Sequence, residues 1–324
     1  MKLHRRILLA ALLTAAAPLL YAQATFPSKP VRILAGFGPG TGPDVVARIL
    51  AQKLSETWNG AAVLVENKTA AGGLLAGSEV ARAAPDGHTL LLGATAQLAI
   101  APHVYKKLPY DPVNDFVAIS QVVSSDFILL VNPEKVPARN VRDFAAFVKQ
   151  QPKGYFMGTF GAGSPGHFGA YILGDAIQSK PESIHYRTTG DVVTGLVSGD
   201  VQGVFGSAGF AVPNVQGGKL VAIGSTGLLR SPALPDVPTM KEQGFPIEFT
   251  AWYAIVAPAK TPADVVAKLS ADIRRAVQGE DAKQKLEAAG FQVTATSADE
   301  LVQIMRRDIG TWGRAVKATG FQAD

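Results

Sequence analysis

The sequence predicts an α/β protein whose strands are mostly parallel, on three observations. Short apolar runs alternate with amphipathic runs along nearly the whole chain, which is the pattern of strands alternating with helices. Polar capping residues stand at the start of several amphipathic runs. The chain has 324 residues, of which 47% are hydrophobic, enough for a large core in one large domain or in two lobes.

The N-terminal segment has the pattern of a secretory signal peptide. The basic residues MKLHRR precede an apolar stretch, residues 7–20, that ends in Ala22-Gln23-Ala24. We expect cleavage after Ala24 and a periplasmic protein; the alternative, an uncleaved membrane anchor, is disfavoured by the short apolar core. Cleavage leaves 300 residues, and because the leader carries Lys2, Arg5, Arg6 and no acid, the formal charge falls from +5 to +2.

The predicted elements follow one another in regular alternation. Strands are predicted at residues 31–35, 63–66, 89–93, 117–123, 127–132, 155–159, 184–187, 201–206, 220–225 and 252–257. Helices are predicted at residues 43–56, 74–83, 141–150, 167–178, 191–198, 262–278, 282–289 and 298–319.

Capping residues mark the start of five of these helices. Each is a Ser or Thr followed by an acid three residues later or by Pro at the first helical position: Thr41 with Asp44, Ser164 with Pro165, Thr188 with Asp191, Thr261 with Pro262 and Asp264, and Ser297 with Glu300. We interpret the last two as purely stabilising. The first three stand beside glycines that leave the helix end uncovered, so we expect ligand contacts there.

Three glycine-rich loops precede those helices. They are GFGPGTGPD at residues 36–44, GAGSPG at residues 161–166 and TTGD at residues 188–191. A loop of this kind directs backbone N–H groups and a helix N-terminus at one point, and such a point attracts anions. Without an obvious catalytic set, three anion-binding loops indicate capture of a small carboxylate rather than its conversion.

Several other function classes find little support. GAGSPG matches a dinucleotide fingerprint, but no acid ends the next strand. It also resembles a nucleophile elbow, which needs a late histidine, whereas the mature histidines are His88, His103, His167 and His185. We therefore expect no enzyme, and a periplasmic serine hydrolase using Ser164 stays the alternative.

Composition adds further exclusions. The histidines are scattered singly and the chain has no cysteine, so we expect no metal, no cofactor, no disulfide and no lipid anchor on an N-terminal cysteine. No block of basic residues interleaved with aromatics occurs, so we expect no nucleic-acid partner.

A series of short motifs runs in order along nearly the whole mature chain. The motifs lie at Phe37, Pro39, Gly40 and Asp44; at Arg48; at Glu66, Asn67, Ala71, Gly72 and Gly73; and at residues 85–91, 108–111, 161–164, 198–202, 236–244 and 257–262. In this order they resemble the substrate-binding proteins of tripartite tricarboxylate transporters, also called Bug receptors.

The resemblance implies a fold and a role. Members are two-lobed periplasmic binding proteins of type II that close on a ligand and hold its carboxylate with backbone amides and hydroxyls. It implies one lobe of residues 25–124 and 251–324 and another of residues 125–250, with crossovers near residues 124–127 and 249–253. It also implies a membrane permease as partner, a small organic carboxylate as ligand and a monomer. A receptor that feeds a membrane sensor kinase is an alternative.

The sequence departs from the family pattern at three places. Thr41 adds a hydroxyl where Pro-Gly-Gly is common, and Arg187-Thr188-Thr189-Gly190 stands where Lys-Gly is usual. Phe160 stands where a small polar residue is usual. With Phe37, Phe168 and Phe205 or Phe210, it could form an apolar wall around the ligand; the alternative is that these rings pack in the lobe cores.

The predicted site joins these loops across a cleft. We expect the N–H groups of residues 161–164 and the Ser164 hydroxyl to hold one carboxylate, the segment 188–191 to hold a second polar group, and the loop 37–41 to close from the other lobe. His167 could donate to a carboxylate or lie on the helix surface, and Arg187 could pair with a dicarboxylate or lie exposed. The full set is Phe37, Pro39, Gly40, Thr41, Asp44, Thr95, Phe160, Gly161, Ala162, Gly163, Ser164, His167, Thr188, Thr189, Gly190, Asp191 and Ser207. Several phenylalanines between two polar ends favour an aromatic dicarboxylate such as terephthalate, or a medium-length one, over citrate.

Overall fold

The computed structural model describes residues 26–69, 73–152, 154–186, 188–231 and 233–323. The predicted signal peptide, Arg187, Ala71 and Gly72 lie outside the described residues. The strands are β1 (Val31–Ala35), β2 (Val63–Asn67), β3 (Thr89–Ala94), β4 (Phe116–Val131), β5 (Phe156–Thr159), β6 (Glu182–His185), β7 (Gly203–Ser207), β8 (Val221–Ser225), β9 (Thr250–Pro258) and β10 (Gln292–Val293). The helices are α2 (Gly42–Thr57), α3 (Leu74–Ala81), the π-helical turn η2 (Ala96–Ile100), α4 (Ala101–Val104), α5 (Val141–Lys149), α6 (Pro165–Ile177), α7 (Thr189–Ser198), α8 (Ala208–Gln216), α9 (Ala263–Gln278), α10 (Glu280–Ala288) and α11 (Ala298–Thr319).

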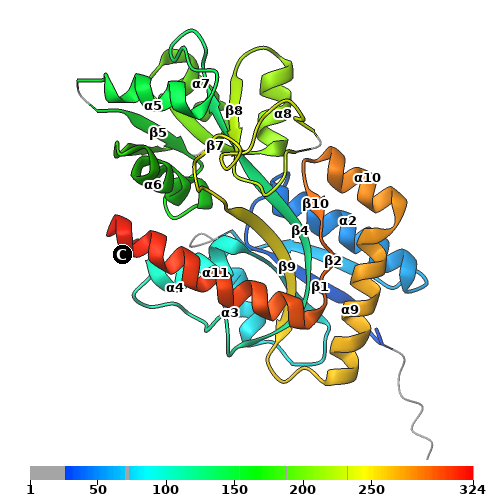
Figure 1. Ribbon diagram of the computed structural model, residues 1–324. Coiled ribbons are helices and arrows are strands. Elements are labelled where there is room, and N and C mark those ends of the chain that lie inside the picture. The colour runs from blue at the N-terminus through cyan, green and yellow to red at the C-terminus, as the bar shows by residue number, and fades with distance from the viewer. Residues whose placement is uncertain (1–25, 70–72, 153, 187, 232, 324) are drawn as a thin grey trace, which may run out of the picture.

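The strands form a mixed sheet in two parts, one in each lobe. Hydrogen-bonded neighbours follow the order β2-β1-β3-β9-β4-β7-β5-β6, and β10 and β8 also pair with β4. The outer strands are parallel within each lobe, β2-β1-β3 in the first and β7-β5-β6 in the second, whereas β9 and β4 run antiparallel to their neighbours. Figure 1 shows the two lobes one above the other with helices around them. The predicted α/β, two-lobed class is confirmed.

Strand β4 belongs to both lobes. Its residues Phe116–Asp126 pair with β9, while Phe127–Leu130 pair with β7. We predicted two strands here, at residues 117–123 and 127–132, and that prediction is wrong, because one strand runs through Ser124, Ser125 and Asp126. All three side chains are buried and lie opposite Thr250, Ala251 and Trp252 of β9. Ladder hydrogen bonds therefore continue through the polar segment.

Alternating strand residues pack into helix layers on both faces. In the first lobe, Ile33 and Leu90 pack with α2 and α9, while Leu34 and Leu91 belong to the cluster that contains α3 and α11 residues. The second lobe has the same arrangement, with α7 and α8 on one face and α5 and α6 on the other. The period of two places successive side chains on opposite faces, so strands covered by helices on both faces, such as β1 and β3, are largely apolar.

Other differences from the predicted elements are local. Helix α8 and the turn η2-α4 were not predicted, and neither was the two-residue strand β10. The cap at Thr261 is also wrong, because its hydroxyl donates to Pro258 O and the helix is capped at Pro262. The capping boxes or caps at Ser164, Thr188 and Ser297 are confirmed by their hydrogen bonds to backbone N–H groups.

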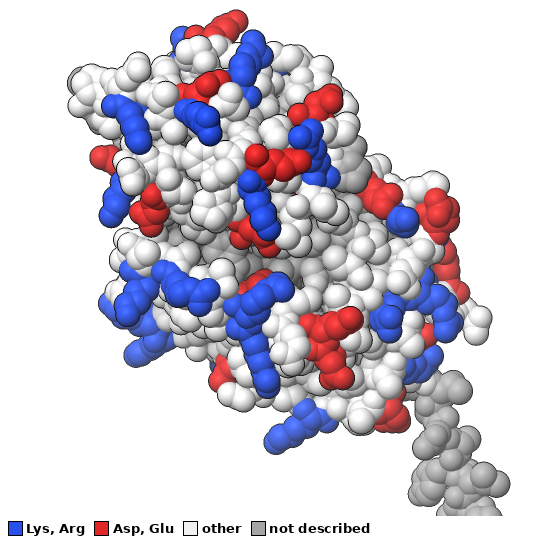
Figure 2. All heavy atoms as spheres, viewed as in Figure 1, with Lys and Arg blue, Asp and Glu red and all other residues white. Residues whose placement is uncertain are grey.

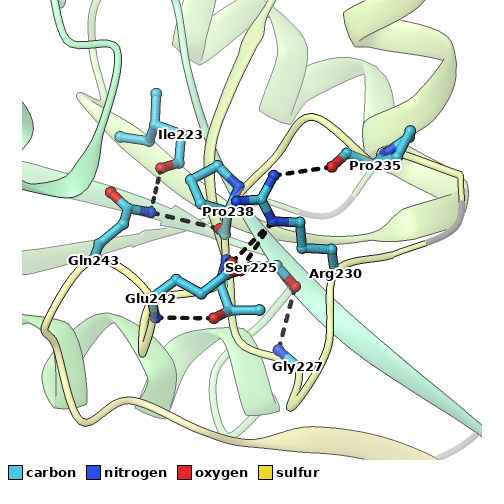
Figure 3. A network of polar contacts seen from close by, with 9 residues as sticks. Ile223, Ser225, Gly227, Arg230, Pro235, Pro238, Glu242 and Gln243 are labelled. Carbon is cyan, nitrogen blue, oxygen red and sulfur yellow. Dashed lines mark hydrogen bonds and ion pairs between the residues drawn. The ribbon is translucent and has the colours of Figure 1, made fainter.

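The long connection from β8 to β9 is held by its own polar network (Figure 3). Glu242 accepts from Arg230 Nε at 3.0 Å and from Thr239 N at 2.6 Å, and Gln243 donates to Ile223 O at 3.0 Å. Arg230 also donates to Pro235 O. The motif at residues 236–244 is thus structural: it folds this connection back onto β8.

Figure 2 shows Lys and Arg interspersed with Asp and Glu over this face of both lobes. Within the described ranges, none of the helices combines the length and apolar character that a membrane crossing requires.

We predict that Trp252 is a sensitive point of the junction. Its indole Nε1 donates to Asp308 Oδ2 at 2.7 Å, and both residues are buried. Trp252→Phe leaves this carboxylate oxygen without its donor, so we expect a loss of about 1–3 kcal/mol in the free energy of unfolding, measured by urea denaturation. Asp308→Asn keeps an oxygen acceptor and should cost less. Equal losses in the two variants would contradict this role of the hydrogen bond.

Candidate functional site

A cavity of about 570 Å³ lies between the two lobes. The first lobe contributes the loop before α2, the end of β3, β9 and the segment after α10, and the second contributes the segments before α6, α7 and α8. The residues that line it are Phe37, Gly40, Thr41, Gly42, Val45, Ala94, Thr95, Ala96, Ser125, Phe127, Phe160, Ser164, Pro165, Gly166, Tyr186, Thr188, Thr189, Ser207, Gly209, Phe210, Ala251, Tyr253, Ala289 and Phe291.

The two crossing strands form the wall between this cavity and a second one. Ser125 and Phe127 of β4 line the first cavity, whereas Ser124 and Asp126 line a cavity of about 470 Å³. Because neighbouring strand residues point to opposite faces, the cavities lie on opposite sides of the junction. A rotation of the lobes about these strands would narrow one cavity while it widens the other.

The first-lobe loop is held in place by Asp44 and Asn67. Asp44 Oδ2 accepts from Gly40 N at 2.8 Å and from Arg48 Nε at 2.9 Å, and Asn67 Nδ2 donates to Asp44 Oδ1 and to Phe37 O. Burial raises the pKa of the Asp44 carboxyl, but the hydrogen bonds from Arg48, Gly40 and Asn67 outweigh it and hold the pKa below its usual value. Asp44 is thus a charged anchor behind the loop.

Thr41 does not act as predicted. It occupies the N-cap position of α2, but its hydroxyl donates to Gly38 O at 2.6 Å and makes no capping bond. The turn before α2 is instead held by the Asp44 side chain, which accepts from Gly40 N. Thr41 still lines the cavity.

The second loop is closed by internal hydrogen bonds. Gly161 N donates to Thr159 Oγ1 at 3.3 Å, Gly163 N to His167 Nδ1 at 3.2 Å and Ser164 N to Gly161 O at 3.4 Å. These three N–H groups are therefore not free to hold a carboxylate in this conformation, contrary to our expectation. Ser164 Oγ accepts from His167 N, which leaves the hydroxyl proton available to the cavity.

Four helix N-termini border the cavity. Gly42 begins α2, Pro165 and Gly166 begin α6, Thr189 begins α7 and Gly209 is the second residue of α8. Thr188 accepts from Asp191 N as N-cap, whereas Ser207 at the N-cap of α8 makes no such bond. Helix N-termini carry partial positive charge and unpaired N–H groups, so an anion in the cavity would be stabilised.

The cavity wall is neutral and rich in aromatic rings. None of the lining residues in the described part of the chain has a charged side chain. Phe160 and Phe210 of the second lobe pack edge to face with ring centroids 5.0 Å apart, and Tyr253 and Phe291 of the first lobe do so at 5.6 Å. Phe168 and Phe205 are fully buried in the core instead, so the alternative holds for them. Such walls suit a flat or apolar body with polar ends.

The structure brings together about half of the predicted set. Phe37, Gly40, Thr41, Thr95, Phe160, Ser164, Thr188, Thr189 and Ser207 line the cavity, whereas Pro39, Asp44, Gly161, Ala162, Gly163, His167, Gly190 and Asp191 do not. Thr95 lines it with its hydroxyl already engaged, because Oγ1 accepts from Trp252 N and donates to Trp252 O. None of the four described histidines lines the cavity. The described residues contain no cluster of three or more His, Asp or Glu side chains placed for a metal ion.

Sequence reasoning missed several lining residues. Tyr186 stands beside the predicted Thr188 and could have been included, since a residue just before a helix cap at a strand end faces the same edge. Phe127, Tyr253 and Phe291 carry no local signal, because only the pairing of β4 with β9 and the return of the chain after α10 bring them here.

The lobes touch at the edge of the cavity. A Cβ added to Gly209 of α8 would lie 2.8 Å from Ala289 O, and one added to Gly290 would lie 2.5 Å from Gly209 N. Only glycine allows the two backbones to approach so closely.

Comparison with known proteins gives consistent matches. The family model described as tripartite tricarboxylate transporter family receptor matches residues 46–321. A UPF0065 protein of Bordetella pertussis is 31% identical over 326 residues, which cover 99% of this chain and 98% of that protein.

Two solved structures from Rhodopseudomonas palustris are also similar. MatC, solved with bound malate, is 31% identical, with a TM-score of 0.78 over 90% of this chain and 100% of that one. A second protein, solved with adipate, is 25% identical, with a TM-score of 0.82 over 92% of this chain and 99% of that one.

Asp44 provides a test of the loop network. Asp44→Ala removes the acceptor for Gly40 N, Arg48 and Asn67, so we expect a loss of about 2–3 kcal/mol in the free energy of unfolding, measured by urea denaturation. Asp264→Ala is the matched control, since Asp264 is an exposed acid in the first turn of α9. A loss as small for Asp44 as for Asp264 would show that the network does not hold the loop.

Proposed function

The chain belongs to the tripartite tricarboxylate transporter receptor family, and we propose that it is a periplasmic receptor that captures a small organic carboxylate between its two lobes. The observation that carries the proposal is a cavity whose described lining residues are uncharged and which is bordered by four helix N-termini and by the hydroxyls of Ser164, Thr188, Thr189 and Ser207. The malate and adipate in two neighbours of similar fold support the same ligand class.

The carboxylate is held by neutral donors in this proposal. The N-termini of α6, α7 and α8 supply backbone N–H groups from the second lobe, and Ser164, Thr188 and Ser207 supply hydroxyls. Closure excludes water, and hydrogen bonds to a charged group strengthen in the resulting low dielectric. The arrangement resembles the anion sites at helix N-termini in other proteins.

The ligand body is proposed to be a dicarboxylate, aromatic or of medium length. Phe160 with Phe210 and Tyr253 with Phe291 offer ring surfaces from both lobes, and Phe37, Gly40 and Thr41 border the cavity from the first lobe. Citrate would bring a third carboxylate into a cavity whose described lining residues have no charged side chain, which costs desolvation energy.

The proposal also covers the lobe boundaries, the membrane partner, the oligomeric state and the export of the protein. We assign residues 25–124 and 251–324 to one lobe and residues 125–250 to the other, which move about the crossing strands β4 and β9. The closed receptor delivers its ligand to a membrane permease. It acts as a monomer and is exported with its signal peptide removed after Ala24.

A binding screen tests the ligand class. We expect isothermal titration calorimetry of the mature protein with malate, adipate, terephthalate, benzoate and citrate to show binding of at least one dicarboxylate, stronger than benzoate and citrate. Binding to the folded state should also raise the melting temperature. Binding of sugars or amines with no response to any of these acids would refute the proposal.

Substitution of Ser164 distinguishes a binding role of its hydroxyl from a catalytic role. Ser164→Ala removes one hydroxyl donor to a charged ligand, so we expect about tenfold weaker binding of the best dicarboxylate and a small loss of stability from the missing cap. Ser198→Ala, which changes a serine at the far end of α7, is the control. Ester hydrolysis by the wild type that disappears in Ser164→Ala would instead favour a serine hydrolase.

A further inference from the structure

His167 makes two hydrogen bonds to the second loop but does not line the cavity. Its backbone N–H donates to Ser164 Oγ at 3.3 Å, and its ring Nδ1 accepts from Gly163 N at 3.2 Å. Gly163 has φ +76°, a conformation that the loop needs in order to turn into α6. One residue thus fixes the orientation of the Ser164 hydroxyl and the path of the loop before it.

A second histidine holds the start of the same loop. His185 Nδ1 lies 2.7 Å from Thr159 Oγ1, and Thr159 Oγ1 accepts from Gly161 N at 3.3 Å. The rings of His167 and His185 pack edge to face with centroids 4.8 Å apart. The two histidines therefore form one support beneath residues 159–164.

The C-terminal segment covers this support from the other lobe. Phe321, just after α11, packs edge to face on His167 with ring centroids 4.9 Å apart and on Phe168 at 6.0 Å. Ala323 N donates to Val104 O at 3.1 Å, which ties the segment to α4 of the first lobe. His167 is 1% exposed as a result.

We infer that His167 is a positioning residue for ligand binding: its neutral ring holds the Ser164 loop through Gly163 N–H, and Phe321 keeps water from that ring. The inference rests on the proposed function for its effect on affinity. It also revises our expectation for His167, which neither faces the ligand nor lies on the helix surface.

The protonation state follows from the geometry. A backbone N–H can only donate, so Nδ1 of His167 must be unprotonated and the ring proton sits on Nε2. A second proton would place two donors face to face and break the bond. Burial lowers the pKa of His167 to about 4, and the charge of His185 adds to this. The titratable groups in ring contact with His167 are His185 of β6 and Tyr171 of α6.

Three variants test the role by calorimetry with adipate and terephthalate at pH 7.5. His167→Leu removes the acceptor at similar size, and we expect about tenfold weaker binding. His167→Asn places an amide oxygen near the position of Nδ1, and we expect affinity within about threefold of the wild type. His103→Leu is the matched control, since it removes a histidine hydrogen bond to Ile309 O outside the cavity, and its affinity should not change. Equal losses in the Leu and Asn variants would overturn the inference.

The pH dependence of ligand affinity distinguishes a positioning role of His167 from a packing role. As the pH falls from 6.5 to about 4, His167 in the unfolded or open loop takes up protons that the native loop cannot, so wild-type affinity should fall more steeply than that of His167→Asn. The dicarboxylate has the same protonation state in both titrations. The ratio of the two affinities therefore reports the effect of the His167 side chain alone. Parallel pH profiles would contradict the inference.

Nuclear magnetic resonance of ¹⁵N-labelled histidine gives a readout that needs no ligand. We expect His167 of the wild type to show an unprotonated Nδ1 and a protonated Nε2 at pH 7, and Phe321→Ala to move its pKa toward 6.5 as water enters. A protonated Nδ1, or an unchanged pKa in the variant, overturns the assignment. If no probe binds the wild type, the proposed function fails while this measurement still decides the state of His167.

Discussion

The structure depends on two strands that pass side by side from one lobe to the other. Strand β4 is hydrogen-bonded to β9 over Phe116–Asp126 and then to β7 and β8 in the second lobe. Because side chains alternate along these strands, Ser125 and Phe127 line the cavity of about 570 Å³ and Ser124 and Asp126 line the cavity on the opposite side. In the proposed function, this pairing sets both the axis of the lobe movement and the position of the ligand.

The helices are arranged around that junction with several of their N-termini at one cavity. Parallel strands in each lobe place helix N-termini at the same sheet edge, and those of α2, α6, α7 and α8 border one cavity. Two titratable residues that do not line the cavity hold its loops: the charged Asp44 anchors the first loop, and the neutral His167 anchors the second. In the proposed function, specificity rests on donor positions and ring surfaces among the described lining residues, which is consistent with one family serving ligands of different shape.

Local sequence signals predicted much of this structure. The caps at Ser164 and Thr188 and the glycines around them placed two helix starts near the cavity, because cap chemistry is set by neighbouring residues. The hydrogen-bond partners of the other predicted site residues depend on tertiary contacts, which the local sequence does not reveal. Thr41 and Thr95 line the cavity as expected, but their hydroxyls already donate hydrogen bonds to Gly38 O and to Trp252 O. The N–H groups of Gly161 and Gly163 were expected to face the ligand, and only the folded loop reveals Thr159 and His167 as their acceptors.

The most direct test of the account is a crystal structure of the mature protein with the best-binding dicarboxylate. The account predicts one carboxylate within 2.7–3.2 Å of backbone N–H groups at the starts of α6, α7 or α8 and of the Ser164, Thr188 or Ser207 hydroxyls, with Gly163 N still bonded to His167. A carboxylate bound by Gly161 and Gly163 N–H groups, or by a charged side chain outside this cavity, would contradict it.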